Sequence, residues 1–268
     1  MAVRESVLST PRLSLRARSA GAGELLVFLH GITAGAAVWD PVLEELAGHY
    51  RCVAVDQRGH GRSDKPATGY TAADYVADVA AVLDVLGPAR AVVGHSLGAR
   101  NAILAGAALP GRIGAVVAVE YVAGMEPEVF ERLRAARAGG DGHLADDDAA
   151  RAAVRARSPL LPDDAVERRV RHLYEPADGG LVPLASPAAV EQTLAAMDVD
   201  LTGALRDSTV PVLLVRGADS PFVSRAAFAR SVGLRPGLQG AVVPGTDHFV
   251  PEEAPLEVAA LVREMVGG

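Results

Sequence analysis

The chain of 268 residues is long enough for one domain with a large core, or for a core that carries an inserted subdomain. Half of its residues are hydrophobic and 22% are charged, and a net charge of -7 without a basic stripe argues against nucleic acid as a partner. A single cysteine, Cys52, excludes an internal disulfide, and no apolar signal core or run of membrane-spanning length occurs, so we expect a cytoplasmic protein without membrane contact.

Short apolar runs recur along the chain, with helical patterns between them. The runs lie at residues 25–29, 52–55, 91–93, 115–119, 212–215 and 241–243. They are continuous rather than alternating, which is typical of strands buried on both faces of a parallel sheet. Strands that alternate with helices predict an α/β fold with a largely parallel sheet.

The clearest helix lies before the third of these strands. Thr71 and Asp74 form the pattern of a capping box, and Gly87-Pro88 ends the helix. The run at 91–93 then leads into a second stretch, residues 97–109, which has helical spacing and many small side chains. This strand, turn and helix are the setting that a nucleophile elbow requires.

Residues 94–98 read Gly-His-Ser-Leu-Gly, the G-x-S-x-G pattern of such an elbow. The pattern holds Ser96 on a sharp turn, and residues two positions away must be small because larger side chains would collide across it. Gly31 follows the first core strand and lets the chain turn there. The backbone N–H groups of Ile32 and Leu97 are therefore the predicted oxyanion hole.

A serine hydroxyl needs a base, and histidine is the usual one because its ordinary pKa lies near neutrality. Of the seven histidines, His248 is the best candidate. It lies in a loop between the last strand and the C-terminal helix, where it can reach the elbow. We expect His30 and His95 to be structural.

Five segments together resemble the α/β-hydrolase superfamily. They are residues 30–46, 53–66, 92–99, 211–220 and 242–255. The resemblance implies an eight-stranded, mostly parallel sheet with helices on both faces, a helical cap over the active site, and no cofactor. The charged loop from Asp56 to Asp64 looks structural in relatives, and we expect its charges and amides to pair behind the site.

Residues 121–207 break the alternation, because they carry Arg-rich helical pieces, several prolines and no strand run like those of the core. We expect a mostly helical cap at 121–207 over the carboxyl edge of the sheet, where α/β proteins bind ligands. The hydrolase core would then comprise residues 1–120 and 208–268.

A carboxylate must orient the histidine, and three candidates compete. The common family pattern after the strand at 212–215 is G-x-x-D, but here Asp219 comes one position early and Ser220 takes the fourth place. Glu120 ends the strand at 115–119, a layout that some members of the superfamily share, and burying it without a partner would be costly. We rank Glu120 first, Asp219 second and Asp247 third, because Asp247 adjoins the base itself.

These residues predict a serine hydrolase that cleaves a small carboxylic ester or lactone through an acyl-enzyme on Ser96. The same triad supports carbon–carbon bond hydrolysis, acyl transfer or cofactor-free perhydrolysis, and a receptor of this fold with little turnover is a third hypothesis. We expect Tyr121, Met125 and Phe249 to border the substrate pocket. The sequence predicts no metal site and leaves the oligomeric state open.

Overall fold

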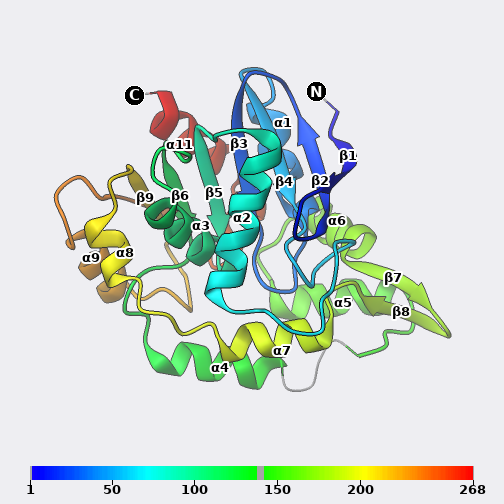
Figure 1. Ribbon diagram of the computed structural model, residues 1–268. Coiled ribbons are helices and arrows are strands. Elements are labelled where there is room, and N and C mark those ends of the chain that lie inside the picture. The colour runs from blue at the N-terminus through cyan, green and yellow to red at the C-terminus, as the bar shows by residue number, and fades with distance from the viewer. Residues whose placement is uncertain (1, 138–141, 268) are drawn as a thin grey trace.

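The computed structural model describes residues 2–137 and 142–267 of the protein (Figure 1). Its centre is an eight-stranded sheet in the order β1-β2-β4-β3-β5-β6-β9-β10. The strands are β1 (Arg4–Ser9), β2 (Ser14–Ala20), β3 (Glu24–Leu29), β4 (Tyr50–Val55), β5 (Ala91–His95), β6 (Val116–Val119), β9 (Val212–Gly217) and β10 (Gln239–Val243). From β4 to β10 all pairs are parallel, while β1–β2 and β2–β4 are antiparallel.

All six strands expected from apolar runs are present. The two N-terminal strands, β1 and β2, have no such run, because β1 is an exposed edge and β2 alternates buried and half-buried residues. At the other edge of the sheet, β10 was expected to be buried on both faces, but it is not. Three of its five residues are exposed, since β10 is an edge strand of the sheet.

Two hydrophobic layers cover the sheet, and alternate residues of each strand point into each layer. Leu25, Val27 and Leu29 of β3 pack with the helices of one face, whereas Leu26 and Phe28 pack with those of the other. The first face carries α2 (Ala72–Leu86), α3 (Leu97–Ala108), α8 (Thr202–Asp207) and α9 (Arg225–Val232). The second carries η1 (Ala36–Trp39), α1 (Asp40–Leu46) and α11 (Pro255–Gly267), and the short α10 (Val250–Glu253) precedes α11.

Helices α4 (Pro127–Arg137), α5 (Asp147–Arg157), α6 (Asp163–Leu173), α7 (Pro187–Ala195) and α8 occupy most of the segment 121–207. In Figure 1, α4, α5 and α7 lie below the sheet. The segment also holds an antiparallel hairpin of β7 (Tyr174–Ala177) and β8 (Gly180–Pro183), which the sequence reading did not anticipate. The Asp178-Gly179 pair between them is a sequence that favours a two-residue hairpin turn, but Pro176 and Pro183 obscure the strand pattern.

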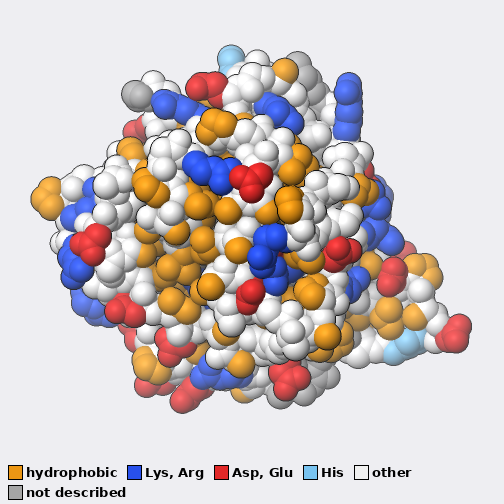
Figure 2. All heavy atoms as spheres, in the orientation of Figure 1, with side chains coloured by type: hydrophobic (Ala, Val, Ile, Leu, Met, Phe, Trp, Pro, Cys, Tyr) orange, Lys and Arg blue, Asp and Glu red, His pale blue; other side chains and the backbone are white. Residues whose placement is uncertain are grey.

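On the face drawn in Figure 2, basic and acidic side chains are interspersed and form no basic stripe. Within residues 2–137 and 142–267, no helix has both the length and the apolar character needed to cross a membrane. Cys52 is buried in β4, where burial raises the pKa of its thiol to about 12.

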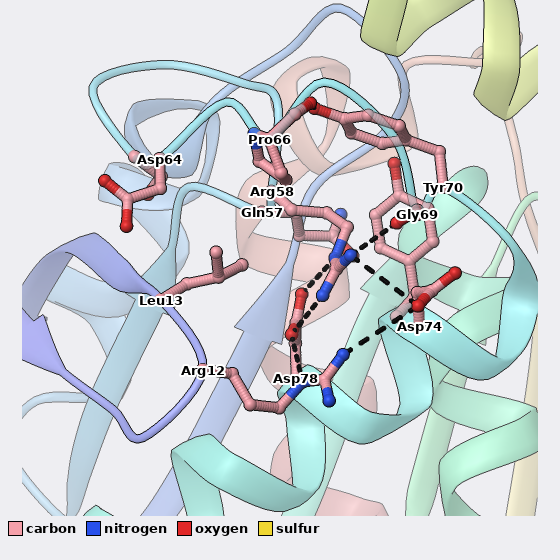
Figure 3. A network of polar contacts seen from close by, with 12 residues as sticks. Arg12, Leu13, Gln57, Arg58, Asp64, Pro66, Gly69, Tyr70, Asp74 and Asp78 are labelled. Atoms are coloured by element: carbon pink, nitrogen blue, oxygen red, sulfur yellow. Dashed lines mark hydrogen bonds and ion pairs between the residues drawn. The ribbon is translucent and has the colours of Figure 1, made fainter.

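The loop after β4 is held by a buried charge network (Figure 3). The Arg58 guanidinium donates to both carboxylate oxygens of Asp78 on α2 and to the carbonyl of Gly69. Asp56 in the same loop accepts from the backbone N–H groups of Ala36 and Arg62. These contacts agree with the expected structural role of this charged loop.

Replacing Asp78 with alanine should lower the free energy of unfolding by about 3 kcal/mol, because Arg58, which is 4% exposed, would keep its charge without its main partner. Asp84→Ala on the same helix is the matched control. It removes an ion pair with Arg112 in which Asp84 is 58% exposed, so its effect should stay below about 1 kcal/mol. Urea unfolding of both variants measures the difference, and equal losses would contradict the assignment.

Candidate active site

Ser96 lies at the turn between β5 and α3 in strained backbone, with φ 52° and ψ -115°. Its N–H donates to the carbonyl of Val119 at 2.8 Å, which ties the turn to the neighbouring β6. A Cβ on Gly94 would lie 2.1 Å from the carbonyl oxygen of Gly98, and one on Gly98 would lie 2.1 Å from that of Leu29. Both glycines are therefore required by close backbone approach, as the elbow pattern predicts.

The loop after β3 lies directly against this turn. A Cβ built on Gly31 would be 3.3 Å from the Cβ of Ser96, so the peptide leading to Ile32 borders the serine. Leu97 is the first residue of α3, and its N–H has no acceptor within the helix. The structure thus brings the loop of Ile32 and the amide of Leu97 to the same side chain.

His30 fixes the backbone of this loop. Its Nε2 accepts the N–H of Gln57 at 2.9 Å, so its Nδ1–H donates to the carbonyl of Gly31 at 2.7 Å. Burial lowers the pKa of His30 to about 4 and keeps the ring neutral. The Gln57 amide donates in turn to the His30 carbonyl and accepts from Asn101. His30 is structural, as expected.

Glu120 and His248 form a buried pair beside the elbow. His248 Nδ1–H donates to Glu120 Oε2 at 3.0 Å, and Glu120 is 1% exposed. Two further donors hold the carboxylate: the Gly217 N–H reaches Oε1 at 2.8 Å, and the Ser220 hydroxyl reaches Oε2 at 2.6 Å. Glu120 adopts a left-handed backbone conformation, φ 63°, at the end of β6, which is uncommon for a residue with a side chain.

The other two acidic candidates lie elsewhere. Asp219 is exposed, and its N–H donates to the Thr246 carbonyl. Asp247 Oδ1 accepts from the backbone N–H groups of His248 and Phe249, so it caps its own turn. Of the three carboxylates considered, the structure brings only Glu120 to the imidazole of His248.

His95 holds the loop of His248 in place through a hydrogen bond to its backbone. Its Nε2–H donates to the His248 carbonyl at 2.7 Å, and the two rings lie 4.8 Å apart. Burial, followed by the nearby His248, moves the pKa of His95 well below its usual value, so the ring stays neutral. Because Ser96 is the next residue, this bond fixes the histidine loop against the elbow.

A pocket lies between the core and the segment 121–207. Ser96, His248 and Glu120 do not line it, but Phe249 does, and the ring centroid of Phe249 lies 5.2 Å from that of His248. The lining of the pocket is Thr33, Val154, Arg157, Arg169, Leu173, Tyr174, Pro183 and Phe249. Of the three pocket residues expected from the sequence, only Phe249 lines it. Tyr121 and Met125 are buried in the large hydrophobic cluster, where the Tyr121 hydroxyl donates to the Met197 carbonyl.

Two arginines line this pocket. Arg169 on α6 stacks over Phe249, with its Cζ 4.6 Å from the ring centroid, and its Nε and Nη2 donate to Glu252, which is 2% exposed. Arg157 on α5 donates to the Tyr174 hydroxyl at 3.2 Å. The sequence predicted neither arginine nor Glu252 as part of a site, because Arg169 and Glu252 are 83 residues apart and nothing local links them.

The chain is similar to a known protein family and to several known proteins. A profile of the Alpha/beta hydrolase family matches residues 26–261. The chain is 45% identical over 245 residues to a 2-(acetamidomethylene)succinate hydrolase of Mesorhizobium japonicum, covering 91% of this chain and 88% of that protein. It is 33% identical over 226 residues to a non-heme chloroperoxidase of Streptomyces lividans, covering 76% and 77%.

Among solved structures, the crystal structure of an E-2-(acetamidomethylene)succinate hydrolase superposes with a TM-score of 0.96 at 41% identity, and the match covers 100% of both chains. The sheet order, the elbow turn and these matches agree with one another. The chain therefore belongs to the Alpha/beta hydrolase family.

Proposed function

We propose that the protein is a serine hydrolase that cleaves an amide bond in a small substrate bearing one or more carboxylates. The observation that carries the proposal is the pocket lined by Arg157 and Arg169, which shares Phe249 with the surroundings of His248, the partner of Glu120. A pocket with two guanidinium groups favours planar anions, because the fork of N–H donors matches a carboxylate.

The proposed mechanism begins with Ser96. Its Oγ attacks the amide carbonyl while His248 Nε2 takes the hydroxyl proton, and Glu120 holds the Nδ1–H tautomer. The N–H groups of Ile32 and Leu97 stabilise the oxyanion. The C–N bond then breaks as His248 returns the proton to the leaving nitrogen. Water, activated by His248, hydrolyses the acyl-enzyme and restores Ser96.

The substrate class follows from the pocket and from the relative's name. 2-(Acetamidomethylene)succinate carries two carboxylates and an acetamido group. Glu252 accepts from the Nε and Nη2 edge of the Arg169 guanidinium, and the two N–H groups of Nη1 lie outside that pair. We assign Arg157 and the Nη1 of Arg169 to the substrate carboxylates, and the segment 121–207, which supplies both, to the role of a cap.

A substrate panel tests this function. It comprises 2-(acetamidomethylene)succinate, its dimethyl ester and 4-nitrophenyl acetate, with release of acetate followed by NMR. We expect the highest kcat/KM for the dicarboxylate amide. If 4-nitrophenyl acetate is the only compound turned over efficiently, the result would instead favour the ester or lactone hydrolase expected from the sequence. Esters and lactones are cleaved through the same kind of acyl-enzyme. Stoichiometric labelling of Ser96 by a fluorophosphonate without turnover of any compound would favour a receptor.

Arg157→Met should raise KM for the dicarboxylate about 10- to 100-fold, because a charge-assisted hydrogen bond is lost, and should change KM for 4-nitrophenyl acetate little. Arg151→Met is the control on the same helix, since Arg151 pairs with Glu167 and Asp148 outside the pocket and should leave both constants unchanged. Steady-state kinetics on the two substrates measure the effect. A proportional rise for both substrates would count against carboxylate binding at Arg157.

A further inference from the structure

We propose that Ser220 is a positioning residue that fixes the carboxylate of Glu120 for His248. The proposal rests on the triad assigned above, and it extends that triad by one hydroxyl. The Ser220 Oγ lies 2.6 Å from Glu120 Oε2, the same oxygen that accepts His248 Nδ1–H at 3.0 Å.

The direction of this hydrogen bond is determined by its surroundings. The N–H groups of Phe222 and Val223 donate to the Ser220 Oγ at 3.3 and 3.0 Å. A hydroxyl has two lone pairs that accept hydrogen bonds and one proton that it can donate. Because the two backbone N–H groups occupy both lone pairs, the hydroxyl donates its proton to Glu120. Ser220 is therefore held as a donor to the carboxylate.

The turn that carries Ser220 is itself fastened to the core. The Ser220 N–H donates to the Gly217 carbonyl at 3.2 Å, and the Asp219 N–H donates to the Thr246 carbonyl at 2.9 Å, two residues before His248. The Gly217 N–H meanwhile holds Oε1 of Glu120. The last residue of β9 and the turn that follows it thus supply a fixed donor to each oxygen of the carboxylate, which prevents it from rotating away from the imidazole.

The hydroxyl also has a purely local use, because it accepts two backbone N–H groups. Ser224 offers the same arrangement away from the site. Its hydroxyl donates to a Glu126 oxygen at 2.6 Å and accepts the Ala227 N–H at 3.0 Å. Ser224 accepts one backbone N–H where Ser220 accepts two, and its glutamate lies outside the site, so Ser224→Ala is a control for the loss of a hydroxyl that holds both backbone and a glutamate.

The test compares Ser220→Ala, Ser220→Thr and Ser224→Ala by their second-order rate of inactivation with a small neutral fluorophosphonate. This probe reports activation of Ser96 and does not depend on the natural substrate. We expect Ser220→Ala to react about tenfold more slowly than the wild type, since a hydrogen bond to a charged group is lost. Ser220→Thr, which keeps the hydroxyl, and Ser224→Ala should react within about twofold of the wild type.

Thermal unfolding of each variant, with rates measured well below the lowest Tm, separates loss of fold from loss of activation. With a substrate that is turned over, Ser220→Ala should lower kcat and leave KM unchanged. A Ser220→Ala rate within twofold of the wild type, or equal losses in the alanine and threonine variants, would overturn the inference. If the wild type itself is not labelled at Ser96, the proposed function fails instead.

Discussion

Replacing Ser96 with alanine should lower kcat about 10⁶-fold and abolish labelling by a fluorophosphonate. The reason is that the acyl-enzyme forms on the Oγ of Ser96, and no other residue of the elbow at 94–98 carries a hydroxyl group. The fold should survive, because alanine removes one atom and the Ser96 N–H to Val119 bond is made by the backbone. Single-turnover kinetics and peptide mapping by mass spectrometry measure the effect.

Ser231→Ala is the control for this substitution. Ser231 is also buried, at 1% exposure, but its hydroxyl donates to the Ala123 carbonyl, away from the elbow. It should keep wild-type labelling and turnover at temperatures where it is folded. If Ser96→Ala retained more than a few per cent of the wild-type kcat on the dicarboxylate amide, the nucleophile assignment would be wrong.

Replacing Glu120 with glutamine should lower kcat about 10³- to 10⁴-fold, with a smaller change in KM. Glu120 accepts from three donors, the Gly217 N–H, the Ser220 hydroxyl and His248 Nδ1–H. A glutamine has one oxygen and one NH₂ group, so at least one of these donors would meet another donor. Where that donor is the imidazole, His248 turns or takes the wrong tautomer and no longer presents a bare Nε2 to Ser96.

Asp219→Asn is the comparison for Glu120→Gln, because it makes the same change of charge in the turn after β9, which lies beside β6 in the sheet. Asp219 is exposed and does not meet the imidazole, so its variant should stay within about twofold of the wild type. Steady-state kinetics of both variants on one substrate decide between the two acids. The opposite result, a collapse in Asp219→Asn and near-normal turnover in Glu120→Gln, would transfer the role to Asp219.

The local parts of the site could be predicted from the sequence because each is encoded in a few neighbouring residues. The glycines around Ser96 mark a turn in which a Cβ would clash with backbone, and apolar runs mark strands that are buried on both faces. The family pattern also suggested that the acid had moved, since Ser220 stands where an aspartate is common. Which carboxylate then meets His248 depends on backbone geometry at the end of β6, and the sequence left that open.

The pocket could not be predicted, because it depends on contacts between distant segments. Arg169 and Glu252 look like ordinary charges of amphipathic helices, and their pairing exists only once α6 packs against α10. Tyr121 and Met125 were expected to border the substrate pocket, but neither lines the pocket between the core and the segment 121–207. They lie instead in the hydrophobic core, which illustrates that large apolar side chains near a site more often fill the core than line the pocket.

The central claim is that an acyl group from a carboxylate-bearing amide passes through Ser96. Rapid acid quenching of the wild-type protein with 2-(acetamidomethylene)succinate, followed by peptide mapping by mass spectrometry, tests it most directly. We expect a transient acetyl group on the peptide that contains Ser96, formed before acetate is released and absent from the Ser96→Ala variant. Acetate release by the wild type with the acetyl group on another residue, or undiminished release by Ser96→Ala, would contradict it.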